Sequence, residues 1–208
     1  MSTPGKRISI LSESEVQDVY SVPQLNSQER DHFFDFSEEE LAAAKGLHSH
    51  QTRIHFLLML GYFKLKSVCL VYSWKDVEVD YRYLVQRYYP KANKKRHSIT
   101  RHTRSRLYKK VCSMERYQRF DTEIEDGLLS NLIKRAKIYV DEIQLFKDAI
   151  QFLKSKRIAI PAYSTLQKLL SRTINTEEAR LSELLRKHLK DKTPFLRLID
   201  SQEKQYRL

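Results

Sequence analysis

Helix-start signals recur through the first forty residues and favour a helical fold. In a capping box, two side chains three positions apart satisfy free backbone N–H groups. This spacing occurs three times, at Ser12 and Glu15, Asn26 and Glu29, and Ser37 and Glu40. The 208 residues include only 4 Gly and 5 Pro, whereas hairpin-rich sheets need more turn residues. Good helix formers dominate the remainder. The sequence therefore predicts an all-α, multi-helix fold.

Apolar periodicity and proline breaks divide the chain into helices. We expect helices over 13–20, 27–35, 38–45, 49–65, 74–89, 99–114, 128–136, 139–156, 163–174, 176–190 and 194–204. Gly46 is expected to end the third helix in a left-handed conformation, and Ser98 to cap the helix over 99–114. Two helical lobes, residues 1–121 and 122–208, are expected to join near residue 122.

Positive charge is concentrated in one segment of the chain. Of a formal net charge of +12, residues 87–119 hold 12 basic side chains and one acidic side chain, Glu115, whereas residues 1–50 hold 4 basic and 9 acidic. Concentrated positive charge repels itself unless a polyanion or a membrane surface neutralises it. Ordinary solvated helix faces also carry charge, but they mix both signs.

The helix expected near 98–114 separates apolar from cationic residues. The face predicted to turn inward, within about 120° on a helical wheel, holds Ile99, Thr103, Leu107, Val111 and Met114. Opposite lie Arg101, Ser105, Tyr108 and Lys109, flanked by Arg104, Arg106 and Lys110. A helix anchored on one face and cationic on the other is typical of a DNA recognition helix. The basic face lacks large apolar residues, which argues against a membrane-lying helix.

The predicted DNA contacts fall into groups by chemistry. Arginine can bond a guanine edge with two N–H groups, and the proposed base or groove readers are Arg101, Arg104 and Arg106. Lysine and hydroxyl side chains more often bond phosphate oxygens, and the proposed phosphate clamps are Lys94, Lys95, Arg96, Lys109 and Lys110. The predicted contact set also includes His97, His102, Ser105, Tyr108, Arg116 and Arg119.

A second candidate surface lies in the expected lobe 122–208. Residues 139–174 can form a helix, a tight turn and a second helix, with Lys156 and Arg157 at the end of the first. Ser164, Lys168 and Arg172 then repeat every four residues on the outer side, while Leu166, Leu169, Leu170 and Ile174 face inward. A helix-turn-helix would present this outer row to DNA. A plain helical hairpin with a basic end explains the pattern equally well.

Catalytic and metal-binding signals are weak. His48, His50 and His55 have no thiol or carboxylate spaced to complete a metal site. Asp76, Glu78 and Asp80 lie at an expected helix start, where acidic residues complement the dipole. We therefore expect no catalytic residues, metal site or cofactor in this chain. Two cysteines, an N-terminus without an apolar signal core and the absence of a spanning apolar stretch favour a reduced, cytoplasmic protein.

The order of several motifs resembles the N-terminal DNA-binding domain of the Tn-three family of replicative transposases. These motifs are Ile10-Leu11-Ser12, Phe36 to Leu41, Arg53 to Phe63, Thr100 to Leu107 with Tyr117 after it, and Phe152 to Pro161 before Leu166 and Leu169. The resemblance covers nearly the whole chain. In one departure, Cys112 to Tyr117 lacks the glycine expected at the end of the basic helix.

The resemblance implies tandem helical units that bind the terminal inverted repeats of a transposon. It also implies a metal-dependent catalytic triad downstream of this chain, self-association of the full-length transposase, and a bacterial, nucleoid-associated location on DNA. Sequence-specific binding of double-stranded DNA is thus the leading hypothesis. Two alternatives stay open: a helical interaction module that docks an acidic protein partner, and RNA binding.

Overall fold

The computed structural model describes residues 8–92, 97–139 and 141–188, and within these ranges the regular elements are helices. They are α1 Glu13–Tyr20, α2 Ser27–Phe33, α3 Glu38–Lys45, α4 His50–Lys66, α5 Trp74–Tyr88, α6 Arg101–Met114, α7 Thr122–Ala136, α8 Glu142–Ser155 and α9 Tyr163–His188. The predicted all-α, multi-helix fold is confirmed. The helix expected over 194–204 lies outside the described residues. In the described part of the chain, no helix is long and apolar enough to cross a membrane.

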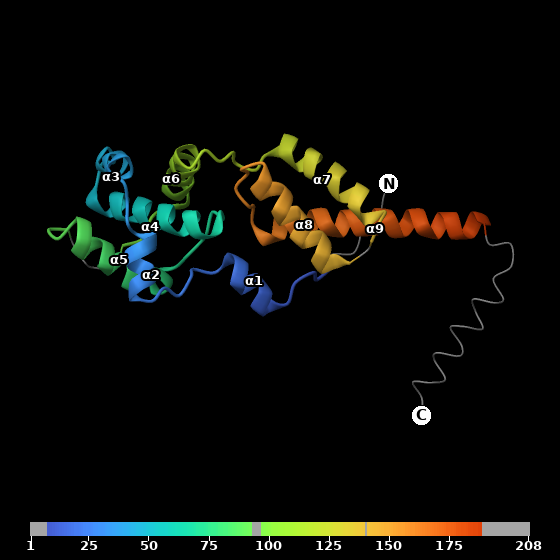
Figure 1. Cartoon of the computed structure of the whole chain (residues 1–208), viewed down its shortest axis with the longest axis horizontal. Helices are drawn as coiled ribbons and strands as arrows, with labels where there is room; N and C mark the ends of the chain where they lie inside the picture. Colours follow the sequence, from blue (N-terminus) through green and yellow to red (C-terminus); the bar gives the residue numbers. More distant parts are fainter. Residues whose placement is uncertain (1–7, 93–96, 140, 189–208) are drawn as a thin grey trace, which may run out of the picture.

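The helices form two groups along the long axis of the molecule. Helices α2 to α6 gather at one end and α7 to α9 at the other, with α1 below the middle (Figure 1). The Ile8 N–H donates to Ser171 Oγ (3.0 Å) and the Leu11 N–H to the Tyr163 hydroxyl (3.1 Å). The first described residues therefore lie against α9. The division into lobes 1–121 and 122–208 stays a prediction.

An extended segment between α8 and α9 forms backbone hydrogen bonds with the group of helices α2 to α6. Isolated parallel β-bridges join Ile160 to Val68 and Ile158 to Gln118. The bonds that make them include Gln118 N–H to Arg157 O (2.8 Å) and Ile160 N–H to Ser67 O (2.9 Å). The expected tight turn between the two helices is therefore wrong, because Arg157, Ala159 and Ile160 bond to the segments that follow α4 and α6.

Helix α4 is the centre of the larger group. Every residue from Ile54 to Phe63 is buried, which is the pattern of a helix surrounded by neighbours on all sides. Helices α2, α3, α5 and α6 all contact it. The longest apolar stretch of the sequence is thus a core helix.

The acidic trio at the start of α5 has two different roles. Asp76 accepts the Ser73 N–H (2.6 Å), as expected for a helix start. Asp80 is buried, where it accepts bonds from Arg30 Nε (2.6 Å) and the Tyr62 hydroxyl (2.6 Å). The helix-dipole interpretation is therefore wrong for Asp80, because a buried carboxylate needs a cation and hydrogen-bond donors around it.

Some helix ends have the capping residues that the sequence predicted, and others do not. All three predicted capping boxes are present, at the starts of α1, α2 and α3. Gly46 has a φ of −66°, so the left-handed cap expected there is wrong. Thr100 rather than Ser98 caps α6, and Asp121 starts α7 six residues before the expected position.

Helix α9 is continuous where two helices were expected. The Thr173 hydroxyl donates to Leu169 O (3.0 Å) and the Thr176 hydroxyl to Arg172 O (2.7 Å). These bonds to the preceding turn satisfy the hydroxyls within the helix. The polar residues around position 175 therefore do not break it.

The close approach of α2 and α4 requires a glycine at position 61. A Cβ there would lie 2.5 Å from ring atoms of Phe34 and 3.1 Å from Phe33 O. We expect Gly61→Ala to lower the free energy of unfolding by about 1–3 kcal/mol through overpacking. Gly127→Ala is the matched control, because that site in α7 has open space and should gain about 0.5–1 kcal/mol. Urea denaturation measures both, and equal effects would contradict the packing argument.

Candidate nucleic-acid interface

Helix α6 packs on α4 through a face that is rotated from the predicted one. Leu107 and Val111 are buried as expected, but they are joined by Tyr108 and Cys112. The Tyr108 hydroxyl donates to Leu70 O (2.8 Å). The predicted position of Tyr108 on the basic face is therefore wrong, because its ring adds apolar contact area and a backbone carbonyl satisfies its hydroxyl.

Two predicted DNA contacts instead hold α6 in place. The Arg104 guanidinium lies 5.4 Å from the centre of the Tyr72 ring and donates to Tyr72 O (3.4 Å). Lys110 Nζ donates to Ala43 O (2.7 Å) and lies 5.6 Å from the centre of the Phe56 ring. Both cations point toward the protein, so they position α6, and their predicted roles as base reader and phosphate clamp do not fit this geometry.

The remaining polar face of α6 is open to solvent. It is formed by five exposed residues, Arg101, His102, Ser105, Arg106 and Lys109, which we call the α6 face. Within the ranges that the structure describes, none of the ion pairs involves these side chains. Glu115 is only half-exposed, and burial raises the pKa of its carboxyl. Predicted residues Lys94, Lys95 and Arg96 lie outside the described residues.

Helix α6 ends in a turn that normally requires glycine. The Tyr117 N–H donates to Cys112 O (2.8 Å) and the Arg116 N–H to Ser113 O (3.2 Å). This is the bonding pattern of a Schellman motif, whose left-handed position is usually glycine. Arg116 occupies that position with a φ of 56°. The glycine missing from the sequence is therefore replaced by an exposed arginine.

Helix α8 ends in the same way. The Ile158 N–H donates to Leu153 O (2.8 Å) and the Arg157 N–H to Lys154 O (3.0 Å), with Arg157 at a φ of 53°. Nothing in the sequence pattern of either segment signals a left-handed arginine. The two motifs are a feature that sequence reasoning missed.

The two helix ends meet at the junction between the helix groups. The Arg157 guanidinium lies 5.5 Å from the centre of the Tyr117 ring, and that ring packs edge-on against Phe63 (5.1 Å between centres). The Gln118 to Arg157 bond of the β-bridge joins the backbones directly. The structure thus brings together exposed cations that the sequence placed in two separate regions. We call these four residues the junction cations: Arg116, Arg119, Lys156 and Arg157.

The outer row of α9 has the predicted orientation. Ser164, Lys168 and Arg172 are exposed, while Leu166, Leu169, Leu170 and Ile174 are buried. The connection from α8 is not the tight turn of a helix-turn-helix, as described above. The DNA-binding role of this row stays a prediction.

Metal-ligand geometry does not occur in the described parts of the chain. No group of three or more His, Cys, Asp or Glu side chains there could hold a metal ion. Cys69 and Cys112 are free thiols.

Comparison with known proteins gives one family. The family described as a domain of unknown function (DUF4158) matches residues 10–173. The chain belongs to this family. No curated protein matches it. The DUF4158 match includes all of α1 to α8, and therefore the α6 face and the junction cations, together with the part of α9 that carries its outer row.

The segment that precedes α6 in this DUF4158 chain contacts a buried histidine, His55. His55 Nε2 lies 3.3 Å from His97 O, and His55 Nδ1 lies 3.1 Å from the Tyr72 hydroxyl. A carbonyl can only accept, so Nε2 carries the proton and Nδ1 accepts from Tyr72. Burial lowers the pKa of His55 to about 4, and the charges of His97 and Arg104 act in the same direction. His97, predicted to touch DNA, therefore supports His55 through its backbone.

This histidine makes stability depend on pH. In the unfolded chain His55 titrates near 6.5, whereas the folded protein keeps it neutral down to about 4. The unfolded state binds the extra proton between these values, so stability falls as the pH drops through this window. We expect a loss of about 2 kcal/mol from His55 between pH 7 and pH 5. His55→Gln should show a smaller loss over the same interval in urea denaturation. Equal losses in both proteins would contradict this assignment.

Proposed function

We propose that this chain binds double-stranded DNA through the α6 face and the junction cations. The single observation that carries the proposal is the exposure of these cations, none of which forms an ion pair among the described residues. Glu115 is the acidic residue whose charge interacts with one of them, Arg157. Seven of the exposed side chains are arginine or lysine: Arg101, Arg106, Lys109, Arg116, Arg119, Lys156 and Arg157. A duplex, with one negative charge per about 1.7 Å of helix axis, is the polyanion that such a surface matches.

The parts of the surface suit different parts of the duplex. Arg101 and Arg106 lie on an exposed helix face, so they are the proposed readers of base edges in the major groove. Lys109 and the junction cations are the proposed phosphate contacts. The start of α6 is the positive end of the helix dipole, which favours a phosphate there. Arg104 and Lys110 act indirectly, because they hold the helix in position.

We further propose that the bound DNA is the terminal inverted repeat of a transposon. The ordered motifs that resemble the Tn-three transposases support this step, and the DUF4158 match spans nearly the same stretch. In this proposal the chain recognises DNA and positions it, while strand transfer takes place in a separate catalytic region. Lys168 and Arg172 of α9 are a proposed second contact with the same DNA.

The salt dependence of binding tests the electrostatic part of the proposal. If the proposed surface neutralises six or more phosphates, affinity for a duplex should fall by roughly 10³–10⁵ between 50 and 200 mM salt. Fluorescence anisotropy with labelled duplexes measures this fall. A flat salt response would contradict DNA binding. A preference for single strands or RNA hairpins over duplex would replace it with RNA recognition.

A substitution at position 116 should move stability and affinity in opposite directions. Arg116→Gly removes the left-handed arginine, which should raise the free energy of unfolding by about 1 kcal/mol. The same change removes one phosphate contact, so it should weaken binding to all duplexes and reduce the salt slope by about 1. Urea denaturation and anisotropy measure the two effects.

Position 67 provides the matched control. Ser67 ends α4 with a φ of 56° and carries no charge. Ser67→Gly relieves the same backbone conformation and removes a hydroxyl bond to Tyr117 (3.3 Å) but no cation, so it should leave DNA affinity unchanged. Unchanged affinity in Arg116→Gly would remove Arg116 from the proposed surface.

A further inference from the structure

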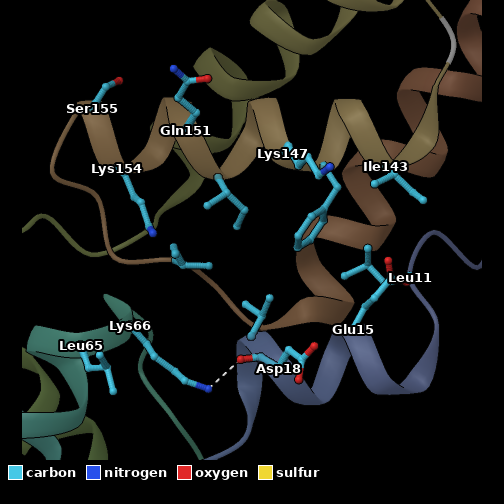
Figure 2. Close-up of a pocket in the computed structure, with 14 residues that line it drawn as sticks. Leu11, Glu15, Asp18, Leu65, Lys66, Ile143, Lys147, Gln151, Lys154 and Ser155 are labelled. Carbon is cyan, nitrogen blue, oxygen red and sulfur yellow. Dashed lines mark hydrogen bonds between the residues drawn. The ribbon is translucent and has the colours of Figure 1, made fainter. Parts of the chain in front are cut away.

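An apolar groove of about 900 Å³ lies between α1 and α8, on a part of the surface that the proposed DNA contacts do not use. Its apolar lining includes Leu11, Val19, Phe146, Ile150 and Ile160. Figure 2 shows α8 along one wall and α1 along the other. Lys66 closes the α4 end, because its Nζ donates to Asp18 O (2.7 Å) and Ser21 O (2.8 Å).

The two walls of the groove carry opposite charges. Lys147 and Lys154 lie on the α8 wall, whereas Glu15 and Asp18 lie on the α1 wall (Figure 2). The charge of Lys147 contributes to lowering the pKa of Glu15, after the bonds from Ser12. An occupant that fits this groove needs an apolar face with an acidic flank on one side and a basic flank on the other.

The second half of α9 has these features. Residues 178–188 are all exposed, and this part of α9 extends past α7 and α8 (Figure 1). Leu181, Leu184 and Leu185 form one stripe, with 39 %, 39 % and 53 % of their surfaces exposed. The spacing i, i+3, i+4 is that of a helix that docks into a groove. On a helical wheel Glu178 lies on one flank of this stripe and Lys187 on the other. Arg180 also lies on the Lys187 side, where it is paired with Glu177 of the same helix.

The exposed apolar residues concentrate at these two places. Eight large apolar side chains are exposed among the described residues, and three of them form the α9 stripe. Two more, Leu65 and Ile143, line the groove. Contiguous exposed apolar surface of this kind marks an interaction site. The groove and the stripe are therefore both apolar surfaces left exposed among the described residues.

Within one chain the stripe cannot reach the groove. The first half of α9 packs against α7 and α8, and the helix continues in the same line away from α1 (Figure 1). A continuous helix cannot turn back on itself. An α9 stripe that fills the groove must therefore come from another molecule, and a second copy of this chain carries the matching helix.

We propose that the groove binds the second half of α9 from a second copy of this chain. Exchange in both directions makes a symmetric pair, in which the same two surfaces are used twice. The α8 lysines face Glu178 of the incoming helix, and the α1 carboxylates face its basic flank. This inference does not depend on DNA binding, and it is tested without DNA.

The test uses two variants that each disable one side of the contact. In the 208-residue chain, Leu184→Glu places a charge on the stripe and Ile143→Glu places one in the groove. Both side chains are partly exposed, so circular dichroism and thermal unfolding should show an intact fold. Sedimentation velocity should show self-association of the unchanged chain, weakened by about tenfold or more in each variant. Val79→Glu, at an exposed apolar residue of α5, is the control and should associate normally.

Mixing the two variants tests whether the stripe of one chain binds the groove of the other. The Ile143→Glu chain keeps an intact α9 stripe and the Leu184→Glu chain keeps an intact groove, so the mixture should form a one-to-one pair that neither variant forms alone. Three results would overturn the proposal: a monomeric unchanged chain at all concentrations, normal association of the Ile143→Glu chain, which would indicate direct pairing of two α9 helices, or no pair in the mixture. Loss of DNA binding in the earlier experiments would leave these outcomes unaffected.

Discussion

The packing of α6 against the buried helix α4 decides which cations of this chain reach solvent. Leu107, Tyr108 and Val111 fix the rotation of α6, and the Tyr108 hydroxyl bond to Leu70 O (2.8 Å) locks it. With that rotation, Arg104 and Lys110 lie at the edges of the contact and bond backbone carbonyls. This rotation determines the exposed face, because residues three or four positions apart lie on the same side of a helix.

The two arginines in left-handed turns show a conflict between backbone preference and charge. Glycine adopts this conformation without a steric penalty, whereas a side chain there costs about 1–2 kcal/mol. Arg116 and Arg157 both occupy such positions and lie on either side of the Gln118 bridge. Violations of local preference are expected where function requires a particular side chain. In the proposed function both guanidinium groups contact phosphates, which would offset this cost, whereas the uncharged Ser67 adopts the same conformation at the end of α4.

Short-range chemistry made part of this fold predictable. The capping boxes depend on residues three positions apart, so Ser12, Asn26 and Ser37 could be assigned from sequence alone. The rotation of α6 could not be predicted in this way. The helical wheel placed Thr103 beside Leu107 and Tyr108 on the opposite face, whereas the acceptor for the Tyr108 hydroxyl is Leu70 O, 38 positions away. The joining of the two basic regions at Gln118 and Arg157 also depends on a long-range backbone contact. The basic character of the interface was thus predictable, whereas its outline was not.

The acidic residues of the N-terminal part do not neutralise the proposed interface. Asp80 forms an ion pair with Arg30, and Glu40 forms one with Lys64. Asp31 and Asp35 both pair with Arg87, the first cation of the basic segment 87–119. These pairs lie on α2 to α5 and the turns between them, so the acids offset cations of the core helices. Clustered cations without such partners lower the stability of the folded chain through their mutual repulsion. The polyanionic partner proposed above would offset this repulsion on the α6 face and at the junction.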